Sequence, residues 1–82
     1  MNEYLASRTV TDGEATSVFI GGASYVRVEE FAPDGTHLQT ASATGGYAAV
    51  LVAPPVVGNT LYVAVTADGE VAFPAGWKVE YP

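Results

Sequence analysis

The amino-acid sequence predicts a small all-β protein, an antiparallel β-sandwich of about seven short strands with little or no helix. Turn-forming pairs recur at short intervals along the 82 residues, and several segments between them alternate apolar and polar side chains with a period of two. No stretch combines a sustained 3.6-residue period with an N-terminal capping residue, as a helix would.

The turns are predicted by dipeptides that favour a reversal of the chain. Three Asp-Gly pairs, beginning at Asp12, Asp34 and Asp68, suit hairpin turns because both residue types tolerate the positive φ that such turns require. Three further breaks are Gly21-Gly22, Gly45-Gly46 and Gly58-Asn59. Between these breaks we expect strands at residues 4–11, 15–20, 24–31, 36–43, 47–53, 60–67 and 77–81, with a short strand at 70–73.

Alternation assigns a core face to the later strands. Leu61, Val63 and Val65 share one face of their strand and are expected in the core. In the last strand Trp77 alternates with Lys78, so Trp77 is expected to be buried as the largest core residue of that strand.

The third strand has an irregular pattern. Val26 and Val28 share a face, but Phe31 has the opposite parity. A bulge at Glu29-Glu30 would return Phe31 to the core.

The segment 47–53 is apolar on both faces. One face is expected in the core. A sandwich of this size has no third layer for the other face, which therefore predicts contact with a partner.

Composition limits how the chain is stabilised and what it binds. We expect one domain, residues 1–82, in which 1–13 is either an N-terminal arm or an extra strand. The chain has no cysteine and one histidine, His37, so neither disulfides nor a four-ligand zinc site can hold it together.

Three Lys and Arg against nine Asp and Glu give a net charge of −6, which disfavours nucleic acid and anionic membranes as partners. A chain this short buries only a little over ~60% of its unfolded surface, so association with other subunits is expected to add stability.

Residues 26–69 contain an ordered series of short motifs. In order they are Val26-Arg27-Val28, Asp34-Gly35-Thr36, a run of small residues from Thr40 to Gly46 ending at Tyr47, Ala53-Pro54-Pro55, Gly58-Asn59-Thr60 and Asp68-Gly69. This series resembles the bacterial immunoglobulin-like (Big-type) domains that occur as repeats in surface adhesins and in phage virion proteins. The resemblance covers about half of the chain and implies an Ig-like sandwich with a structural or adhesive role. Residues 1–13 have no counterpart in it, and the chain continues through 71–82, where such a repeat usually ends.

Catalytic residues are not predicted. A nucleophilic site needs a base, an acid that orients it and an oxyanion hole. His37 follows the turn at Asp34, and this arrangement is ordinary for a hairpin. The sequence therefore predicts no enzyme and no cofactor.

Calcium is a weaker possibility. Asp12, Asp68 and Glu70 lie at expected turns, and Ca²⁺ takes six to eight oxygen ligands, often from loops. The turns at Asp12 and Asp68 would have to share one end of the sandwich. No local calcium-loop motif is present, so we expect these residues to serve the turns and no metal to bind.

Aromatic side chains are more numerous than so small a core requires. Tyr and Trp are favoured at interfaces because they combine apolar area with a polar group. Tyr25, Tyr47 and Tyr62 are therefore candidates for a binding face, as an alternative to capping the sheet edges.

Together these features predict a non-enzymatic structural protein. The favoured function is phage virion decoration, in which the chain cements a capsid surface as a homo-oligomer with a protein partner. No secretory signal peptide is visible, so synthesis in the host cytoplasm and location in the virion are expected. The longest apolar run, 47–57, is too short for the ~20 residues that span a bilayer. The alternative is an adhesive or carbohydrate-binding Ig-like module of an extracellular surface protein.

Overall fold

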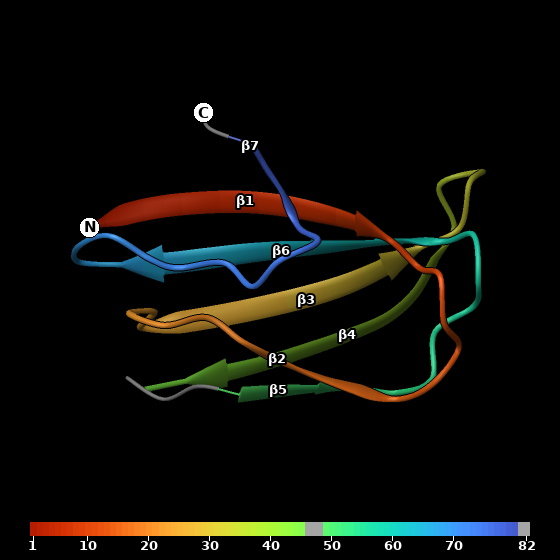
Figure 1. The fold of residues 1–82 in the computed structure, drawn as a ribbon, viewed down its shortest axis with the longest axis horizontal. Coiled ribbons are helices and arrows are strands. Elements are labelled where there is room, and N and C mark those ends of the chain that lie inside the picture. The colour runs from red at the N-terminus through yellow and green to blue at the C-terminus, as the bar shows by residue number, and fades with distance from the viewer. Residues whose placement is uncertain (46–48, 81–82) are drawn as a thin grey trace.

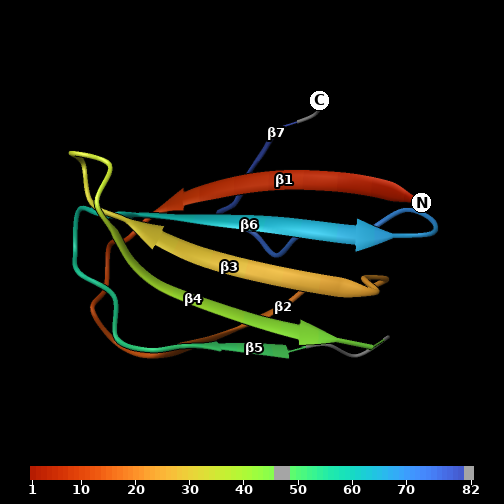
Figure 2. The same ribbon diagram turned by 180° about the vertical axis from the view of Figure 1, so that it is seen from behind.

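The computed structural model describes residues 1–45 and 49–80, and these form an all-β fold of seven strands in two antiparallel sheets (Figures 1 and 2). The strands are β1 (Asn2–Thr9), β2 (Thr16–Phe19), β3 (Tyr25–Phe31), β4 (His37–Thr44), β5 (Ala49–Val52), β6 (Thr60–Ala67) and β7 (Lys78–Glu80). The larger sheet has the order β4-β3-β6-β1-β7, and the smaller sheet pairs β2 with β5. The described residues include no helix that could cross a membrane.

The N-terminal segment forms a strand inside the larger sheet. β1 pairs with β6 along its whole length, from Asn2 opposite Ala67 to Thr9 opposite Thr60. On its other side β1 pairs with β7 over only three residues. Because β1 belongs to the larger sheet, β2 has β5 as its only ladder partner among the described strands.

The core consists mainly of valines from facing strands. Cross-strand pairing places Val28 opposite Val63, and Val63 opposite Ala6, so these side chains share the inner face of the larger sheet. Val18 and Val50 pair on the inner face of the smaller sheet. The buried apolar residues are Ala6, Val10, Val18, Ile20, Ala23, Val26, Val28, Val50, Val52, Leu61, Val63, Val65 and Ala67.

Two expected features of the C-terminal part are wrong. Residues 70–73 form no strand; a single bridge joins Ala72 to Gly21. Trp77 precedes β7 and is only partly buried, packing against the core from its margin rather than within it.

The irregularity in β3 is present, but its consequence differs from the expectation. The register against β4 shifts between Glu30 and Phe31, as a bulge would require. Phe31 nevertheless stays on the outer face, where its ring lies 5.7 Å from that of Tyr62 and 5.4 Å from that of His37. The inner position after Val28 is taken by Glu30, which is 1% exposed.

Glu30 holds one side of the sandwich together. Its Oε1 accepts a hydrogen bond from Gln39 Nε2 at 2.8 Å, and its Oε2 accepts from the Val56 backbone N–H at 2.9 Å and from Asn59 Nδ2 at 2.8 Å. Gln39 also binds both backbone groups of Ala53, so β4 is joined to the segment that follows β5. We call Glu30, Gln39, Val56, Asn59 and Ala53 the polar clasp.

The clasp is consistent only with an ionised Glu30. Burial alone would raise the pKa of the Glu30 carboxyl. The hydrogen bonds donated by Gln39, Val56 and Asn59 outweigh burial, so the pKa lies below its ordinary value of 4.5.

Candidate functional site

The outer face of the larger sheet carries two of the three predicted tyrosines. Tyr25 pairs with Thr66, and Glu29 pairs with Tyr62, so both tyrosines project from the face opposite the core. Tyr62 is 47% exposed. Tyr47 lies outside the described residues, so the structure does not place it. We call the side of the larger sheet opposite the core the outer sheet face. Its residues include Glu3, Leu5, Ser7, Tyr25, Arg27, Glu29, Phe31, Tyr62, Ala64, Lys78 and Glu80.

This face is nearly neutral for so acidic a chain. Cross-strand pairing puts Arg27 and Lys78 on the same side as Glu3, Glu29 and Glu80, a net charge of −1. The rest of the chain therefore carries −5 of the total −6. Arg27 is also neutralised locally, because its Nε lies 3.1 Å from Glu29 Oε1.

The smaller sheet has an uncharged outer face. Ser17 pairs with Leu51, and Phe19 pairs with Ala49, on the side opposite Val18 and Val50. Leu51 is 69% exposed and Phe19 is 46% exposed. The segment 47–53 was predicted to be apolar on both faces. Its described residues, 49–53, have one face in the core and the other exposed to solvent.

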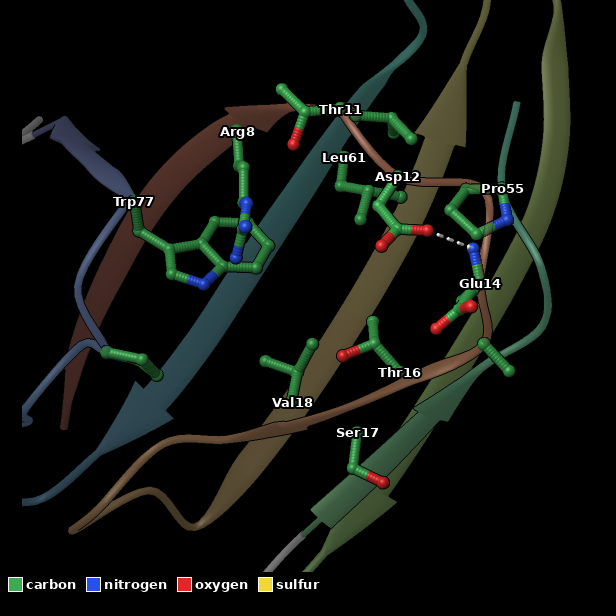
Figure 3. A pocket seen from close by; sticks show the side chains of 13 residues that line it. Arg8, Thr11, Asp12, Glu14, Thr16, Ser17, Val18, Pro55, Leu61 and Trp77 are labelled. Carbon is green, nitrogen blue, oxygen red and sulfur yellow. Dashed lines mark hydrogen bonds between the residues drawn. The ribbon is translucent and has the colours of Figure 1, made fainter. Parts of the chain in front are cut away.

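A cleft of about 270 Å³ opens on the side of the sandwich away from the clasp (Figure 3). One wall is formed by Arg8, Pro74 and Trp77, and the floor includes the buried side chains of Val18 and Leu61. The opposite wall comes from the connection between β1 and β2. The remaining lining residues are Val10, Thr11, Asp12, Glu14, Ala15, Thr16, Ser17 and Pro55.

Local geometry fixes both walls. Asp12 Oδ1 accepts a hydrogen bond from the Glu14 backbone N–H at 2.9 Å, which shapes the turn at Gly13. On the other wall Gly76 has a φ of 95°, and a Cβ at this position would lie 3.7 Å from Arg8 Cζ. The Arg8 contact would be an ordinary van der Waals distance, so glycine is required here for the left-handed turn before Trp77.

Several polar groups of the cleft have no protein partner within residues 1–45 and 49–80. Neither the Arg8 guanidinium nor Trp77 Nε1 makes a hydrogen bond or ion pair there. The same holds for Asp12 Oδ2 and the Thr16 hydroxyl. These groups are available to solvent or to a ligand.

The three weak calcium candidates do not come together. Asp12 follows β1 beyond Thr9, which pairs with Thr60, whereas Asp68 and Glu70 follow Ala67, which pairs with Asn2. Eight paired residues therefore separate the two turns, about 25 Å at the usual rise of a strand. The shared end of the sandwich that a calcium site at these turns would need is therefore not present. In the described part of the chain no three Asp, Glu or His side chains form a group suited to a metal ion.

His37 lies on the outer side of the larger sheet. Its Nε2 is hydrogen-bonded to Thr40 Oγ1 and lies 3.7 Å from Glu29 Oε2. Asp34 instead accepts a hydrogen bond from the Thr36 backbone N–H, which stabilises the turn. Histidine and aspartate thus serve different local contacts.

Sequence patterns did not reveal the cleft or the clasp. Arg8 and Trp77 are distant in sequence, and only the insertion of β1 between β6 and β7 brings them together. Comparisons with protein-family models, with curated proteins and with solved structures found no match for this chain.

Proposed function

We propose that the protein is a non-enzymatic structural protein of a phage virion, which decorates or cements the capsid by binding its surface through the outer sheet face. The observation that carries the proposal is this broad, nearly neutral face, on which Tyr62 is exposed and Tyr25 and Phe31 are half-buried. Aromatic side chains at a surface are favoured in interfaces because they combine apolar area with, in tyrosine, a polar group.

The size of the face suits a protein partner. Its four long strands extend over about 27 Å by about 19 Å, from the usual strand rise and spacing, or roughly 500 Å² before side-chain relief is counted. Each partner in a standard interface contributes about 800 Å² of accessible surface. The smaller sheet offers only about 130 Å² by the same measure, too little to bind a partner alone.

Charge favours the same face. A protein with a net charge of −6 is repelled by most acidic surfaces, and repulsion is weakest where its own charge is nearly balanced. Tyr62 on β6 adds contact area and a hydroxyl group well inside the face, and Tyr25 adds the same at the end of the neighbouring strand β3, four positions away along the ladder.

The homo-oligomer is proposed to form through the smaller sheet. A second copy of the chain would cover Phe19 and Leu51, which carry no charge and lie away from the outer sheet face. The contact is small, so it is expected to strengthen when the capsid holds copies close together.

The first test is the genomic neighbourhood, where a gene for a major capsid protein is expected beside the gene for this chain. That capsid protein is then used for the binding test. Shells assembled by co-expression are sedimented, and the chain is expected to sediment with them. Tyr62→Ala is expected to reduce the bound fraction at least tenfold, as loss of a central aromatic contact of about 1.4 kcal/mol or more would do.

Phe19→Ala is the matched control. Phe19 has nearly the same exposed fraction as Tyr62 but lies on the smaller sheet. This variant should still bind shells at high occupancy and lose only contacts between copies. Equal loss in both variants, or a genome without any capsid or portal gene near this one, would contradict the proposal.

The alternative, a carbohydrate-binding module, is favoured by a different observation. The cleft beside Trp77 combines an aromatic wall with unpaired polar groups. It lies away from the outer sheet face and can be tested separately.

A further inference from the structure

The cleft has the size of a site for one small ring. Clefts that bury a drug-sized ligand measure about 300–1,000 Å³, and this cleft is about 270 Å³. It lies beside β2, whose Thr16 and Val18 belong to its lining (Figure 3). A single ring, free or at the end of a chain, would fill it.

The floor and one wall require that the ligand have an apolar face. Val10, Val18 and Leu61 are buried beneath the cleft, and the partly buried Trp77 forms its wall. The face of an indole ring is electron-rich and attracts the weakly positive hydrogens of C–H groups. A ring with C–H groups on one face would therefore pack on Trp77.

The polar lining requires hydroxyl groups around that ring. Arg8 and Trp77 Nε1 offer only N–H donors, Asp12 and Glu14 offer only acceptors, and the Thr16 hydroxyl does both. A ligand that meets donors on one wall and acceptors on the other must itself donate and accept. Hydroxyl groups have this property, as amides do, whereas a carboxylate or an ammonium group by itself does not.

Charge disfavours anionic ligands. Asp12 and Glu14 repel anions in a chain whose net charge is already −6, while Arg8 on the facing wall offsets one of the two carboxylates, so the lining keeps a net charge of only −1 to attract a cation. A phosphate or a carboxylate would meet Arg8 favourably but would also face two carboxylates. The lining fits an uncharged ligand.

From these four properties we infer that the cleft binds one neutral hexopyranose ring of a saccharide, with its C–H face on Trp77 and its hydroxyls bonded to Arg8 and Asp12. This inference is independent of capsid binding, because the cleft shares no residue with the outer sheet face. It gives the chain a second surface, for a glycan.

Trp77 is the only tryptophan in the chain, so its fluorescence reports on the cleft alone. The whole chain is titrated with D-glucose, D-galactose and D-mannose, and with lactose and cellobiose. At least one neutral sugar is expected to change the Trp77 emission saturably, and calorimetry should give the same dissociation constant. D-glucuronate and D-glucosamine are expected to bind more weakly than the neutral sugar.

Arg8→Gln should weaken sugar binding about tenfold or more, the effect of losing a hydrogen bond from a charged donor. Arg27→Gln is the matched control, since Arg27 lies on the outer sheet face, and should leave the affinity unchanged. The inference is overturned if no neutral sugar changes emission or heat, if either charged sugar binds best, or if Arg8→Gln and Arg27→Gln bind alike.

The two proposals fail separately. Tyr62→Ala is expected to keep the sugar response, and Arg8→Gln is expected to keep the sedimentation with shells.

Discussion

The two long sides of the sandwich are completed in opposite ways. Where β4 meets β5, the polar clasp joins the sheets through a carboxylate that is 1% exposed. Where β2 faces Trp77, the sheets remain apart and the cleft is lined by polar groups with no partner in the described protein. A side closed by buried polar groups must satisfy every one of them, whereas an open side can leave its groups for a ligand.

The largest effect is expected from breaking the clasp with Glu30→Gln. Three N–H donors converge on the carboxylate, and the amide that replaces it turns an NH₂ group toward at least one of them. Hydrogen bonds to charged groups contribute about 1.5–3 kcal/mol each, so we expect a loss of about 3 kcal/mol or more in the free energy of unfolding. Urea denaturation measures it.

Glu29→Gln is the control for this variant. Glu29 lies next in sequence but on the outer face, where its ion pair with Arg27 is solvent-accessible. Its loss should cost about 1 kcal/mol or less. Similar costs in the two variants would show that the clasp does not hold the closed side.

The pH dependence of stability separates the clasp from other carboxylates. The pKa of Glu30 in the folded chain lies below its ordinary value of 4.5, because its three hydrogen bonds outweigh burial. A depressed folded pKa stabilises the native state above the unfolded pKa, and this contribution is lost as pH falls through the folded pKa. The stability gap between wild type and Glu30→Gln should therefore be constant above about pH 5 and narrow below pH 4.5.

Asp34 is a second acidic group to consider. The backbone N–H of Thr36 lowers the pKa of Asp34. This contribution is the same in the wild type and in Glu30→Gln, so it cancels in the difference between their stabilities. A gap that stays constant down to pH 3 would mean that Glu30 is not ionised in the clasp. Chemical denaturation at each pH gives the comparison.

Truncation of the cleft wall at Trp77 is expected to lower the free energy of unfolding by less than Glu30→Gln does. Trp77→Ala should lose about 1–2 kcal/mol, since Trp77 is partly exposed and a fully buried aromatic loses about 3–5 kcal/mol. The variant should still unfold cooperatively in urea. Loss of cooperative folding would mean that this side belongs to the core, as the alternation of Trp77 with Lys78 first indicated.

Alternation and turn residues in the sequence predicted most of the strands. They did not predict the clasp on one side of the sandwich or the cleft on the other. β6 has the predicted bounds, 60–67, because alternation is unbroken and turn residues flank it. The other expected strands are found within a few residues, apart from 70–73. β2 and β3 are shorter than predicted by a residue or two, since propensity alone does not show where pairing stops.

Glu30 shows why the clasp was missed. Its parity with Val26 and Val28 placed it on the inner face, yet a carboxylate there is costly unless it is bonded. Its partners Gln39, Val56 and Asn59 are 9, 26 and 29 residues away, so no local window contains them. A charged residue on the apolar parity of a strand is the signal that would have pointed to such a network.

The cleft depends on topology in the same way. Arg8 reaches Trp77 only because β1 pairs with both β6 and β7. Alternation predicts which face a residue occupies but not the order of strands in a sheet. Tyr25 and Tyr62 were candidates for a binding face from their chemistry, and only the structure shows that they lie on the same face of neighbouring strands.

The smallest expected effect is that of calcium on the melting temperature. It tests whether a cation joins the two walls of the cleft. Asp12 and Glu14 are the only carboxylates in the cleft lining, and Asp12 already uses Oδ1 for the Glu14 backbone N–H. Asp68 and Glu70 are too far away to contribute the further oxygens of the six to eight that Ca²⁺ requires. We therefore expect the melting temperature to be the same, within error, in millimolar calcium and in chelator.

A ligand that binds the native state raises stability by mass action, so a rise of several degrees would show that a cation joins the walls of the cleft. Asp12→Asn decides the origin of any such rise, because the amide oxygen can still accept from the Glu14 N–H while the charge is gone. If the rise disappears in this variant, calcium binds at the cleft, and the two sides of the sandwich are closed by different means rather than one being closed and the other open.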